Sequence, residues 1–259
     1  MKPLVVSDID CAQLHRLYVD EGLSCRLVGQ QIGLAASNVH SRLKLCGISR
    51  RTPSPGPPDK YAYDKEFWES WHPTMAWVLG LVFSDGSVTK HGVILCQKDD
   101  ALLWKMNRLG ITSAEPIHYK SGACSTIRLG SQWLHDLLTE RYGCTSNKSR
   151  TMLWPDPPAE CLSHFVRGLW DGDGNINRQG KRSFQLAYTS GSQSFVYSFR
   201  EALRTGYVRE YVGKYKPYWR LTIGARDAIR ALQWMYTEST ESTRLARKYM
   251  IVKDVLTQS

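Results

Sequence analysis

One pattern occurs twice in this 259-residue chain, and the repeat constrains the fold more than any other feature. The first copy, residues 77–86, reads WVLGLVFSDG, and the second, residues 165–174, reads FVRGLWDGDG, so that Asp85 corresponds to Asp173. Each copy is followed by the same order of strand, helix, strand and helix signals. The sequence therefore predicts an α+β fold in which one αββαββα unit is used twice.

The elements expected after each copy follow from the spacing of apolar residues. In the first copy they are strands around Val88 and at 93–97, a helix at 101–109, a strand at 125–129 and a helix at 133–142. In the second copy they are a strand at 184–189, a helix at 194–203, a strand at 218–223 and a helix at 228–236.

Small residues line one face of each repeated helix. Ala76, Gly80 and Ser84 lie four residues apart in the first copy, and Gly168 and Gly172 do so in the second. Such a stripe lets two helix backbones touch. We therefore expect the two helices to pack against each other at Gly80 and Gly168.

Each repeated helix ends in Asp-Gly, where we expect Gly86 and Gly174 to take the left-handed conformation that closes a helix. Asp85 and Asp173 would then lie side by side, each at the negative end of a helix dipole. A divalent cation between them removes both the repulsion and the dipole penalty. Mg²⁺ prefers hard oxygen ligands that leave room for water and phosphate, so the pattern predicts a metal site at these two aspartates.

The segments VLGLVFSDG and VRGLWDGDG resemble the two motifs of a monomeric LAGLIDADG homing endonuclease, and the resemblance covers residues 61–259. The second copy fits well, whereas in the first Phe83 replaces the sixth-position aspartate of the motif and Ser84 its alanine. The resemblance implies a pseudo-symmetric saddle whose two four-stranded sheets lie in the DNA major groove. It also implies a monomer that needs no protein partner and cuts both strands of a long, asymmetric double-stranded DNA target, leaving short 3′ overhangs.

The resemblance assigns the chemistry to particular residues. Mg²⁺ ions would be held by Asp85 and Asp173, together with the backbone carbonyls of Ser84 and Gly172, for a two-metal hydrolysis. Mn²⁺ is expected to substitute for Mg²⁺, and Ca²⁺ to support binding without cleavage.

Members of this family also carry basic or amide side chains near strand ends, where they order the attacking water. Gln97 and Lys98 match such a position in the first copy, whereas the second copy has Tyr188 and Thr189. The resemblance therefore implies two unequal catalytic sites. No equivalent of the family's lysine is evident after the fourth strand of either copy.

Alternation along the strands directs one set of side chains towards DNA and the other, such as Ile127 and Leu221, onto the helices. The DNA-facing candidates are Lys90, Arg128, Arg182, Gln185, Lys214, Lys216 and Arg220. For Lys148, Arg247 and Lys248 we expect phosphate contacts or helix capping instead.

The first 51 residues carry a separate helical pattern. Apolar spacing predicts helices at 12–19, 26–32 and 37–45, with Ser24 as the N-cap of the second helix and Gly33 in the turn that follows it. The segment resembles a helix-turn-helix of resolvase-like and phage DNA-binding proteins, which implies that its third helix lies in a major groove. The alternative is a small three-helix protein-binding module. The candidate DNA-binding side chains on the third helix are Ser37, Asn38, His40, Ser41, Arg42 and Lys44.

Four prolines between residues 52 and 60 predict an extended linker. The expected organisation is a helix-turn-helix domain at 1–51, the linker at 52–60, a first repeat at 61–150 and a second repeat at 151–259.

Charge and composition agree with a polyanionic partner. The chain has a net charge of +10, and residues 146–259 alone carry 18 basic and 10 acidic side chains. The longest apolar run, 75–83, is too short to span a bilayer, and Asp8 lies where a signal peptide would be apolar. We therefore expect a cytoplasmic protein with no membrane partner. The seven cysteines include no CxxC pair, so we expect small buried thiols rather than disulfides or a zinc site.

Three other functions use the same fold. A transcriptional regulator would bind DNA without cutting it, but such regulators lose the catalytic acids, which this chain keeps at Asp85 and Asp173. An RNA maturase that assists intron splicing would need the same basic saddle, and only substrate tests separate it from an endonuclease. An intein would need a terminal nucleophile and a His-Asn ending, so we favour a free-standing or intron-encoded enzyme.

Overall fold

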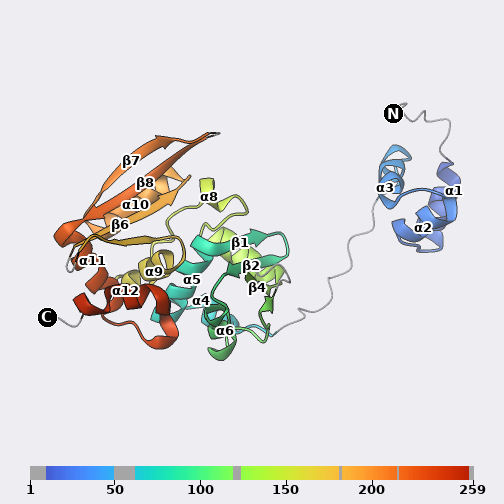
Figure 1. The fold of residues 1–259 in the computed structure, drawn as a ribbon. Coiled ribbons are helices and arrows are strands. Elements are labelled where there is room, and N and C mark those ends of the chain that lie inside the picture. Colours follow the sequence, from blue (N-terminus) through green and yellow to red (C-terminus); the bar gives the residue numbers. More distant parts are fainter. Residues whose placement is uncertain (1–9, 50–61, 119–123, 181–182, 215, 257–259) are drawn as a thin grey trace. The chain divides into compact units, whose positions relative to one another are not determined.

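The computed structural model describes residues 10–49, 62–118, 124–180, 183–214 and 216–256 (Figure 1). The chain divides into two compact units, residues 1–57 and 58–259. The predicted linker at 52–60 lies outside the described residues, as does Arg182 among the predicted DNA-facing side chains. The domain boundaries expected from the sequence stay predictions.

The N-terminal unit is a small helical bundle. Ser24 Oγ accepts a hydrogen bond from the Leu27 amide at 3.3 Å, which makes Ser24 the expected N-cap, and Gly33 (φ 70°) forms the turn to the next helix. The core consists of Leu14, Leu17, Tyr18, Val28, Val39 and Leu43. The elements are α1 (Cys11–His15), a π-helical turn η2 (Arg16–Asp20), α2 (Cys25–Ile32) and α3 (Ala36–Leu45).

The second unit contains the αββαββα order twice, as the sequence predicts. The first repeat consists of α5 (Pro73–Asp85), β1 (Gly86–Thr89), β2 (Gly92–Gln97), α6 (Asp100–Arg108), β3 (Ile117–His118), β4 (Ser125–Leu129) and α7 (Gln132–Asp136), which continues as η3 (Leu137–Arg141). The second consists of α9 (Ala159–Gly172), β5 (Asn175–Arg178), β6 (Phe184–Ser190), α10 (Gln193–Leu203), β7 (Tyr207–Val212), β8 (Pro217–Gly224) and α11 (Ala225–Tyr236). Additional helices are α4 (Lys65–Glu69), α8 (Lys148–Thr151), η4 (Glu241–Thr243) and α12 (Ala246–Leu256). None of the helices in the described part of the chain is long and apolar enough to cross a membrane.

Within the described residues, each repeat forms a four-stranded antiparallel sheet, with strand orders β1-β2-β4-β3 and β5-β6-β8-β7. One side of each sheet packs on helices: α6 and α7 contact the first sheet, and α10 and α11 contact the second. Ile127 and Leu221 are buried on this side, whereas Arg128 is exposed on the other. We call the side opposite the helices the open face of each sheet.

Helices α5 and α9 lie side by side between the two sheets (Figure 1). They touch at the expected glycines. A Cβ placed on Gly80 would lie 2.8 Å from the Gly168 Cα, and one placed on Gly168 would lie 2.9 Å from the Gly80 Cα. The small residues are needed because any side chain at these two positions would meet the backbone of the other helix.

The expectation that Gly86 and Gly174 take the left-handed conformation is wrong. Gly86 has φ −76° and ψ 145°, and Gly174 has no positive φ either. A lack of space for a side chain, rather than the backbone conformation, requires glycine at both positions. A Cβ on Gly86 would lie 3.0 Å from the Val82 Cα, and one on Gly174 would lie 2.7 Å from the Trp170 Cα.

The expectation that the cysteines are buried thiols is wrong for two pairs. A disulfide joins Cys11 to Cys46 in the N-terminal unit, and another joins Cys96 to Cys124 in the first repeat, with Cα–Cα distances of 5.5 and 6.3 Å. The partners are 35 and 28 residues apart in the sequence. Such spacings carry no signal of pairing, because only the fold brings the partners together.

Candidate active site

The two motif aspartates lie at the C-terminal ends of the paired helices. Asp85 is the last residue of α5, and Asp173 is the C-cap of α9. The two helix ends are close, since a Cβ placed on Gly172 would lie 2.7 Å from Asp85 Oδ2 and would also meet the Ser84 side chain. The fold therefore brings together the predicted metal-binding residues Asp85, Asp173, Ser84 and Gly172.

The surroundings of both carboxylates disfavour their negative charge. Burial, and next the charge of Asp173, raise the pKa of Asp85 from 3.8 to about 6. Partial desolvation also raises the pKa of Asp173, whose side chain is more exposed. The ammonium groups of Lys148 and Lys248 act in the opposite direction on both aspartates. A site where two carboxylates repel each other favours a cation.

Two lysines, one from each repeat, donate to the ends of the paired helices. Lys148 Nζ donates to the carbonyl oxygen of Ser84 and, at 2.6 Å, to that of Phe83. Lys248 Nζ donates to the carbonyl oxygen of Gly172 at 2.8 Å and to two neighbouring carbonyls. Each ammonium group therefore stabilises the negative end of a helix dipole beside an aspartate.

Burial lowers the pKa of both lysines, that of Lys248 to about 8. Of the two roles expected for these lysines, helix capping and phosphate contacts, the structure shows capping. Their position beside the two aspartates was not predicted. A signal is nevertheless present in the sequence. Each lysine follows the last helix of its repeat, so the repeat that pairs Asp85 with Asp173 also pairs Lys148 with Lys248.

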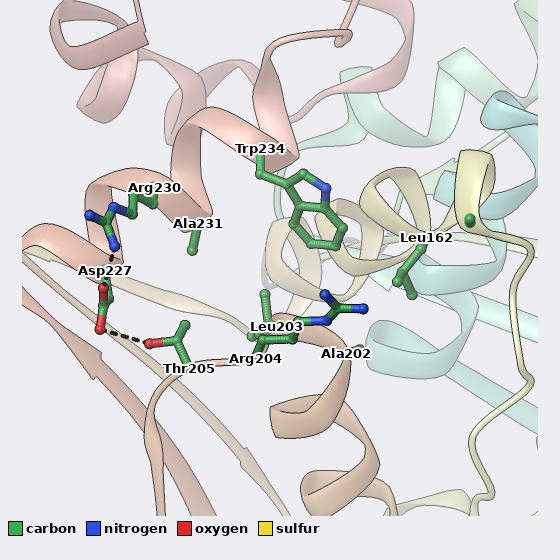
Figure 2. Close-up of a pocket in the computed structure, with 10 residues that line it drawn as sticks. Leu162, Ala202, Leu203, Arg204, Thr205, Asp227, Arg230, Ala231 and Trp234 are labelled. Atoms are coloured by element: carbon green, nitrogen blue, oxygen red, sulfur yellow. Dashed lines mark hydrogen bonds and ion pairs between the residues drawn. The ribbon is translucent and has the colours of Figure 1, made fainter.

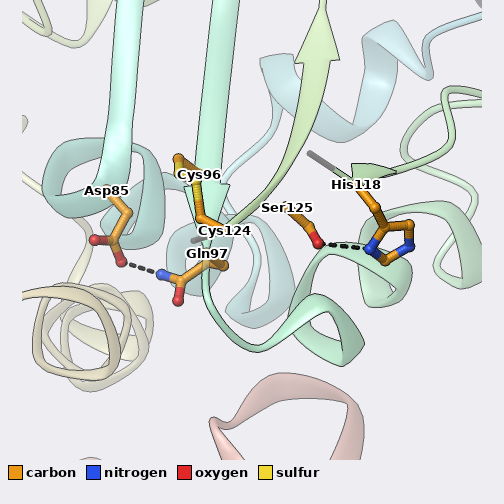
Figure 3. Close-up of a disulfide and its surroundings, with 6 residues drawn as sticks. All are labelled: Asp85, Cys96, Gln97, His118, Cys124 and Ser125. Carbon is orange, nitrogen blue, oxygen red and sulfur yellow. Dashed lines mark hydrogen bonds between the residues drawn. A yellow bond between two sulfur atoms is a disulfide. The ribbon is translucent and has the colours of Figure 1, made fainter. Parts of the chain in front are cut away.

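Gln97 reaches the site from the end of β2. Its side-chain amide donates to Asp85 Oδ2 (Figure 3). Lys98, the other predicted auxiliary residue, lies just beyond β2 and is exposed. Among the contacts of the described residues, Gln97 therefore reaches a motif aspartate and Lys98 does not.

The second repeat differs at the position of Gln97. The strand registers align Leu95 with Tyr188, so Ser190, rather than Tyr188 or Thr189, corresponds to Gln97. The Ser190 hydroxyl accepts a hydrogen bond from a nearby backbone amide at 3.1 Å. Tyr188 and Thr189 were expected at this position because the strand was expected to end at Thr189, whereas β6 is longer than β2 and ends at Ser190.

The donor set at the helix ends fits a hard divalent cation. It consists of the carboxylates of Asp85 and Asp173 and the carbonyls of Ser84 and Gly172, which are all oxygen ligands, and the two carbonyls also accept hydrogen bonds from Lys148 and Lys248. Within the described ranges, no group of three or more His, Cys, Asp or Glu side chains is arranged to hold a metal ion. A cation at the aspartate pair would therefore complete its shell with carbonyls, water and phosphate.

The two paired helices differ at the motif position where Phe83 replaces aspartate. Its counterpart, Asp171, is fully buried and accepts hydrogen bonds from Trp77 Nε1 at 2.9 Å and from the Tyr236 hydroxyl at 2.6 Å. Phe83 packs edge-on against Phe165, with 5.4 Å between ring centroids. The substitution is therefore accommodated within an aromatic core and leaves the end of α5 in place.

The predicted DNA-facing residues that the structure describes lie on the open faces or in hairpin turns. The open faces carry Arg128, Gln185 and Arg220, and the turns carry Lys90, Lys214 and Lys216. Arg220 lies directly opposite Arg209 across β7 and β8. Two like charges in opposite positions are unfavourable by themselves, so this part of the open face favours an anion.

In the N-terminal unit, the predicted DNA-binding residues lie along α3. Exposed side chains are Ser37, Asn38, Ser41 and Lys44, and half-buried ones are His40 and Arg42. His40 Nδ1 lies 3.9 Å from Cys25 Sγ, and Arg42 Nε is buried without a hydrogen-bond partner among the described residues. The four exposed side chains share one surface, and their role in DNA binding stays a prediction.

A cavity in the second repeat is separate from the carboxylate pair. It lies among α9, α10 and α11, with Leu162 and Trp234 in its lining (Figure 2). Its carboxylate, Asp227, accepts hydrogen bonds from the Thr205 hydroxyl at 2.9 Å and from Arg230 at 3.5 Å. None of the aspartates or lysines at the helix ends lines this cavity, so it is not part of the candidate active site.

Asp85→Asn is expected to stabilise the fold at neutral pH in buffer without divalent metal. The folded state binds the Asp85 proton more tightly than the unfolded state, so stability is lost as the pH rises from 3.8 to about 6. The shift corresponds to at most ~3 kcal/mol, and partial exposure of the side chain reduces the gain to about 1 kcal/mol. Denaturant unfolding at neutral pH and near pH 3.8 measures the difference, which should vanish at the lower pH. Equal stability of the two proteins at neutral pH would contradict the raised pKa of Asp85.

Comparison with known proteins bears on the part of the chain around Asp173. Residues 160–233 match the family model described as a LAGLIDADG-like domain. The chain carries a LAGLIDADG-like domain. This LAGLIDADG-like domain begins within α9, includes Asp173 and the whole second sheet, and ends within α11. The first repeat has the same order of elements as the LAGLIDADG-like domain.

A curated relative and several solved structures are also similar to parts of this chain. The DNA-directed RNA polymerase subunit Rpo1C of Methanocaldococcus jannaschii is 29% identical over 124 residues, which cover 46% of this chain and 14% of that protein. The meganuclease I-SmaMI bound to uncleaveable DNA is 11% identical, with a TM-score of 0.44, and the match covers 71% of this chain and 88% of that chain. The I-LtrWI LAGLIDADG homing endonuclease bound to target DNA is 14% identical, with a TM-score of 0.47, over 74% of this chain and 90% of that chain.

Proposed function

We propose that this protein is a site-specific double-strand DNA endonuclease that acts as a monomer with a divalent metal ion. The observation that supports the proposal most is the convergence of Asp85 and Asp173 at the ends of two touching helices between two sheets. Burial, and next the charge of Asp173, raise the pKa of Asp85 to about 6 despite the two nearby lysines, so without a bound divalent cation the ionised Asp85 destabilises the fold at neutral pH.

The open faces of the two sheets supply the DNA-binding surface in this proposal. A two-stranded ribbon fits the major groove, and Arg128 and Arg220 lie on the open faces of the first and second sheets. The net charge of +10 favours phosphate contacts along a long duplex. Because the two sheets carry different side chains, the target would be asymmetric.

The residues at the helix ends would carry the hydrolysis. Mg²⁺, or Mn²⁺ in its place, would polarise the phosphoryl oxygens, activate water and stabilise the leaving oxygen when held by Asp85 and Asp173 with the Ser84 and Gly172 carbonyls. Ca²⁺ would support binding without cleavage. Each aspartate would serve one strand, and the products would carry short 3′ overhangs.

The lysines and Gln97 would act on charge and on water around the scissile phosphates. Lys148 and Lys248 place positive charge beside the aspartates, where negative charge develops on a phosphoryl group. Lys248, with a pKa of about 8, can exchange a proton near neutral pH and is the better candidate for proton transfer. The Gln97 amide, which contacts Asp85, can orient a water molecule on the side of the first repeat.

Cleavage of a randomised duplex library tests the proposal directly. The protein is incubated with the library in Mg²⁺, Mn²⁺ or Ca²⁺, and the ends are sequenced. Recurrent 3′-overhang ends around one long motif, formed in Mg²⁺ or Mn²⁺ but not in Ca²⁺, are expected. Enrichment of bound duplexes with no cut ends in any metal would instead indicate a regulator or a maturase.

We also propose that α3 of the N-terminal unit contacts DNA next to the main site. Deleting residues 1–51 is expected to weaken duplex binding about tenfold or more, because a tethered second module adds effective concentration. The deletion should also reduce the magnitude of the slope of log binding constant against log salt concentration by about one for each phosphate contact that is lost. The position of the cut should not change, since the deletion leaves both aspartates in place.

Titrations of a cleavable duplex at several salt concentrations measure this effect. Lys44→Ala in the intact chain is the matched variant, because it removes one exposed cation of α3 without removing the unit. It should reproduce part of the loss. Unchanged affinity after the deletion would show that the unit has another partner.

A further inference from the structure

The Cys96–Cys124 disulfide crosses the first sheet close to the candidate active site (Figure 3). Cys96 lies on β2, and Cys124 lies immediately before β4. Cys96 pairs in register with Thr126, so the bond runs diagonally from one strand to its neighbour. Cys96 is exposed, whereas Leu95 and Gln97 on either side of it are buried. The bond therefore lies on the open face of the sheet, where solutes reach it.

Each cysteine precedes a residue that holds this end of the sheet. Gln97 follows Cys96 and donates to Asp85 (Figure 3). Ser125 follows Cys124, and its Oγ lies 2.8 Å from His118 Nδ1. Gln97 and Ser125 are also direct partners in the register of β2 and β4. The cross-link thus joins the strand end that contacts the aspartate to the edge formed by β3 and β4.

Besides its pairing with β4, the polar side-chain contacts of edge strand β3 among the described residues are those of His118, with Ser125 Oγ at 2.8 Å and with Asp100 Oδ2 at 3.6 Å. The strand consists of Ile117 and His118, both exposed, and pairs with β4 through Thr126 and Ser125. Strands this short have few backbone hydrogen bonds and open locally at low free-energy cost. A covalent bond next to Ser125 therefore has a large effect on the order of this edge.

We propose that Cys96 and Cys124 form a reversible thiol–disulfide site that reacts with low-molecular-weight disulfides of the glutathione type. The state of this site determines how well ordered the β3–β4 edge is, and thereby the affinity for DNA. The coupling to DNA rests on the function proposed above. Exposed disulfides are the ones that exchange readily. The chemistry of the site itself does not depend on the DNA-binding proposal.

The oxidation proceeds by two exchange steps. The thiolate of Cys96, the more exposed partner, attacks one sulfur of glutathione disulfide, forms a mixed disulfide and releases one glutathione thiolate. The thiolate of Cys124 then attacks the Cys96 sulfur and releases the second. The two protein thiols lose two electrons, the small disulfide is reduced to two thiols, and those thiols take up the two protons.

The other free thiols of the second unit are poor competitors for this reaction. Cys144 and Cys161 are buried, and burial raises the pKa of the Cys144 thiol to about 12. A thiol that stays protonated does not react, because the thiolate is the nucleophile in exchange. The Cys11–Cys46 pair belongs to the N-terminal unit and supplies a matched control.

The test uses the full chain equilibrated in buffers of reduced and oxidised glutathione. Free thiols are trapped by alkylation, and peptide mapping measures the fraction of chains in which Cys96 and Cys124 are cross-linked. Hydrogen exchange at 117–118 and 125–129 reports the order of the edge. Binding to a pool of random-sequence duplexes is measured in the same buffers. The test variant is Cys96→Ser with Cys124→Ser, and the control variant is Cys11→Ser with Cys46→Ser.

Reduction is expected to break the cross-link, to speed exchange at 117–118 and 125–129 about tenfold, and to weaken duplex binding several-fold, as expected for residues that must then be ordered on binding. The Cys96/Cys124 variant should behave like the reduced protein in every buffer, whereas the Cys11/Cys46 variant should still respond.

Absence of the Cys96–Cys124 cross-link at every glutathione ratio overturns the proposal, and so does a cross-link that changes neither hydrogen exchange nor binding. If cross-link and exchange respond as expected but no duplex binds in any state, the thiol–disulfide site stands and the proposed function fails.

Discussion

Asp85→Asn combined with Asp173→Asn is expected to abolish double-strand cleavage while duplex binding stays intact. The carboxylates lie at the ends of α5 and α9, and the amide of asparagine keeps their shape but removes the charge that holds a divalent cation. Loss of charge stabilisation at a reacting centre costs about 10³-fold or more in rate. The basic side chains on the open faces are unchanged, so affinity for the target should change little.

Each single variant gives a more specific result. If each aspartate serves one strand, Asp85→Asn should leave a nick in one strand and Asp173→Asn a nick in the other. Denaturing gels with a label on either strand separate these products. Asp156→Asn is the matched control, because Asp156 is exposed and its φ of 47° suits asparagine as well. It should cut both strands at the normal rate.

Normal cleavage by the double variant would show that hydrolysis takes place elsewhere. Loss of binding together with cleavage would show that the aspartates support the fold of the DNA-binding surface rather than the reaction. The variants fold at least as well as the parent chain if the pKa argument holds, since removing the Asp85 charge relieves the cost of burying that charge and its repulsion from Asp173. Unfolding measurements on the same samples therefore separate lost chemistry from lost structure.

The order of helices and strands in the second unit could be predicted because the repeat states it twice. A weak strand signal in one copy is supported by its counterpart, as at 125–129 and 218–223. The contact between α5 and α9 could be predicted as well, because Gly80 and Gly168 leave no side chain on the touching faces. These are features in which local sequence and tertiary packing agree.

The conformation of the glycines after the aspartates could not be predicted in the same way. Glycine follows a helix for two different physical reasons, a positive φ or a lack of space. Gly86 and Gly174 are required by the proximity of Val82 and Trp170. Only the packed structure distinguishes crowding from backbone conformation, because the amino-acid type is the same in both cases.

The lysines and the disulfides depend on distant parts of the chain. Lys148 reaches the Ser84 carbonyl across 64 residues, and Cys96 reaches Cys124 across 28. Neither spacing matches a local motif. The repeat supplies a rule for Lys148 and Lys248, since equivalent positions in two copies meet at the axis between them, but no such rule exists for a cysteine pair found in one copy alone.

Gly80→Ala and Gly168→Ala are each expected to lower the free energy of unfolding by about 3 kcal/mol, the upper end of the usual cost of overpacking a core. A methyl group on Gly80 would meet the Phe165 carbonyl oxygen and the Leu169 amide, and one on Gly168 would meet the Trp77 carbonyl oxygen. These are backbone atoms within helices, which cannot move aside as a flexible side chain does. Alanine would otherwise favour the helix by up to ~1 kcal/mol, so a net loss measures the contact between α5 and α9.

Urea unfolding of the two variants measures the loss, with Gly130→Ala as the matched control. A Cβ on Gly130 would lie 3.7 Å from the nearest atom, which is ordinary contact, so this change should be nearly neutral. The same helix contact sets the positions of Asp85 and Asp173, and the glycine variants should therefore also lose cleavage under conditions where they remain folded. A Gly80→Ala protein as stable as the Gly130→Ala control would show that α5 and α9 are not in backbone contact, and the paired aspartates would then lack the framework that brings them together.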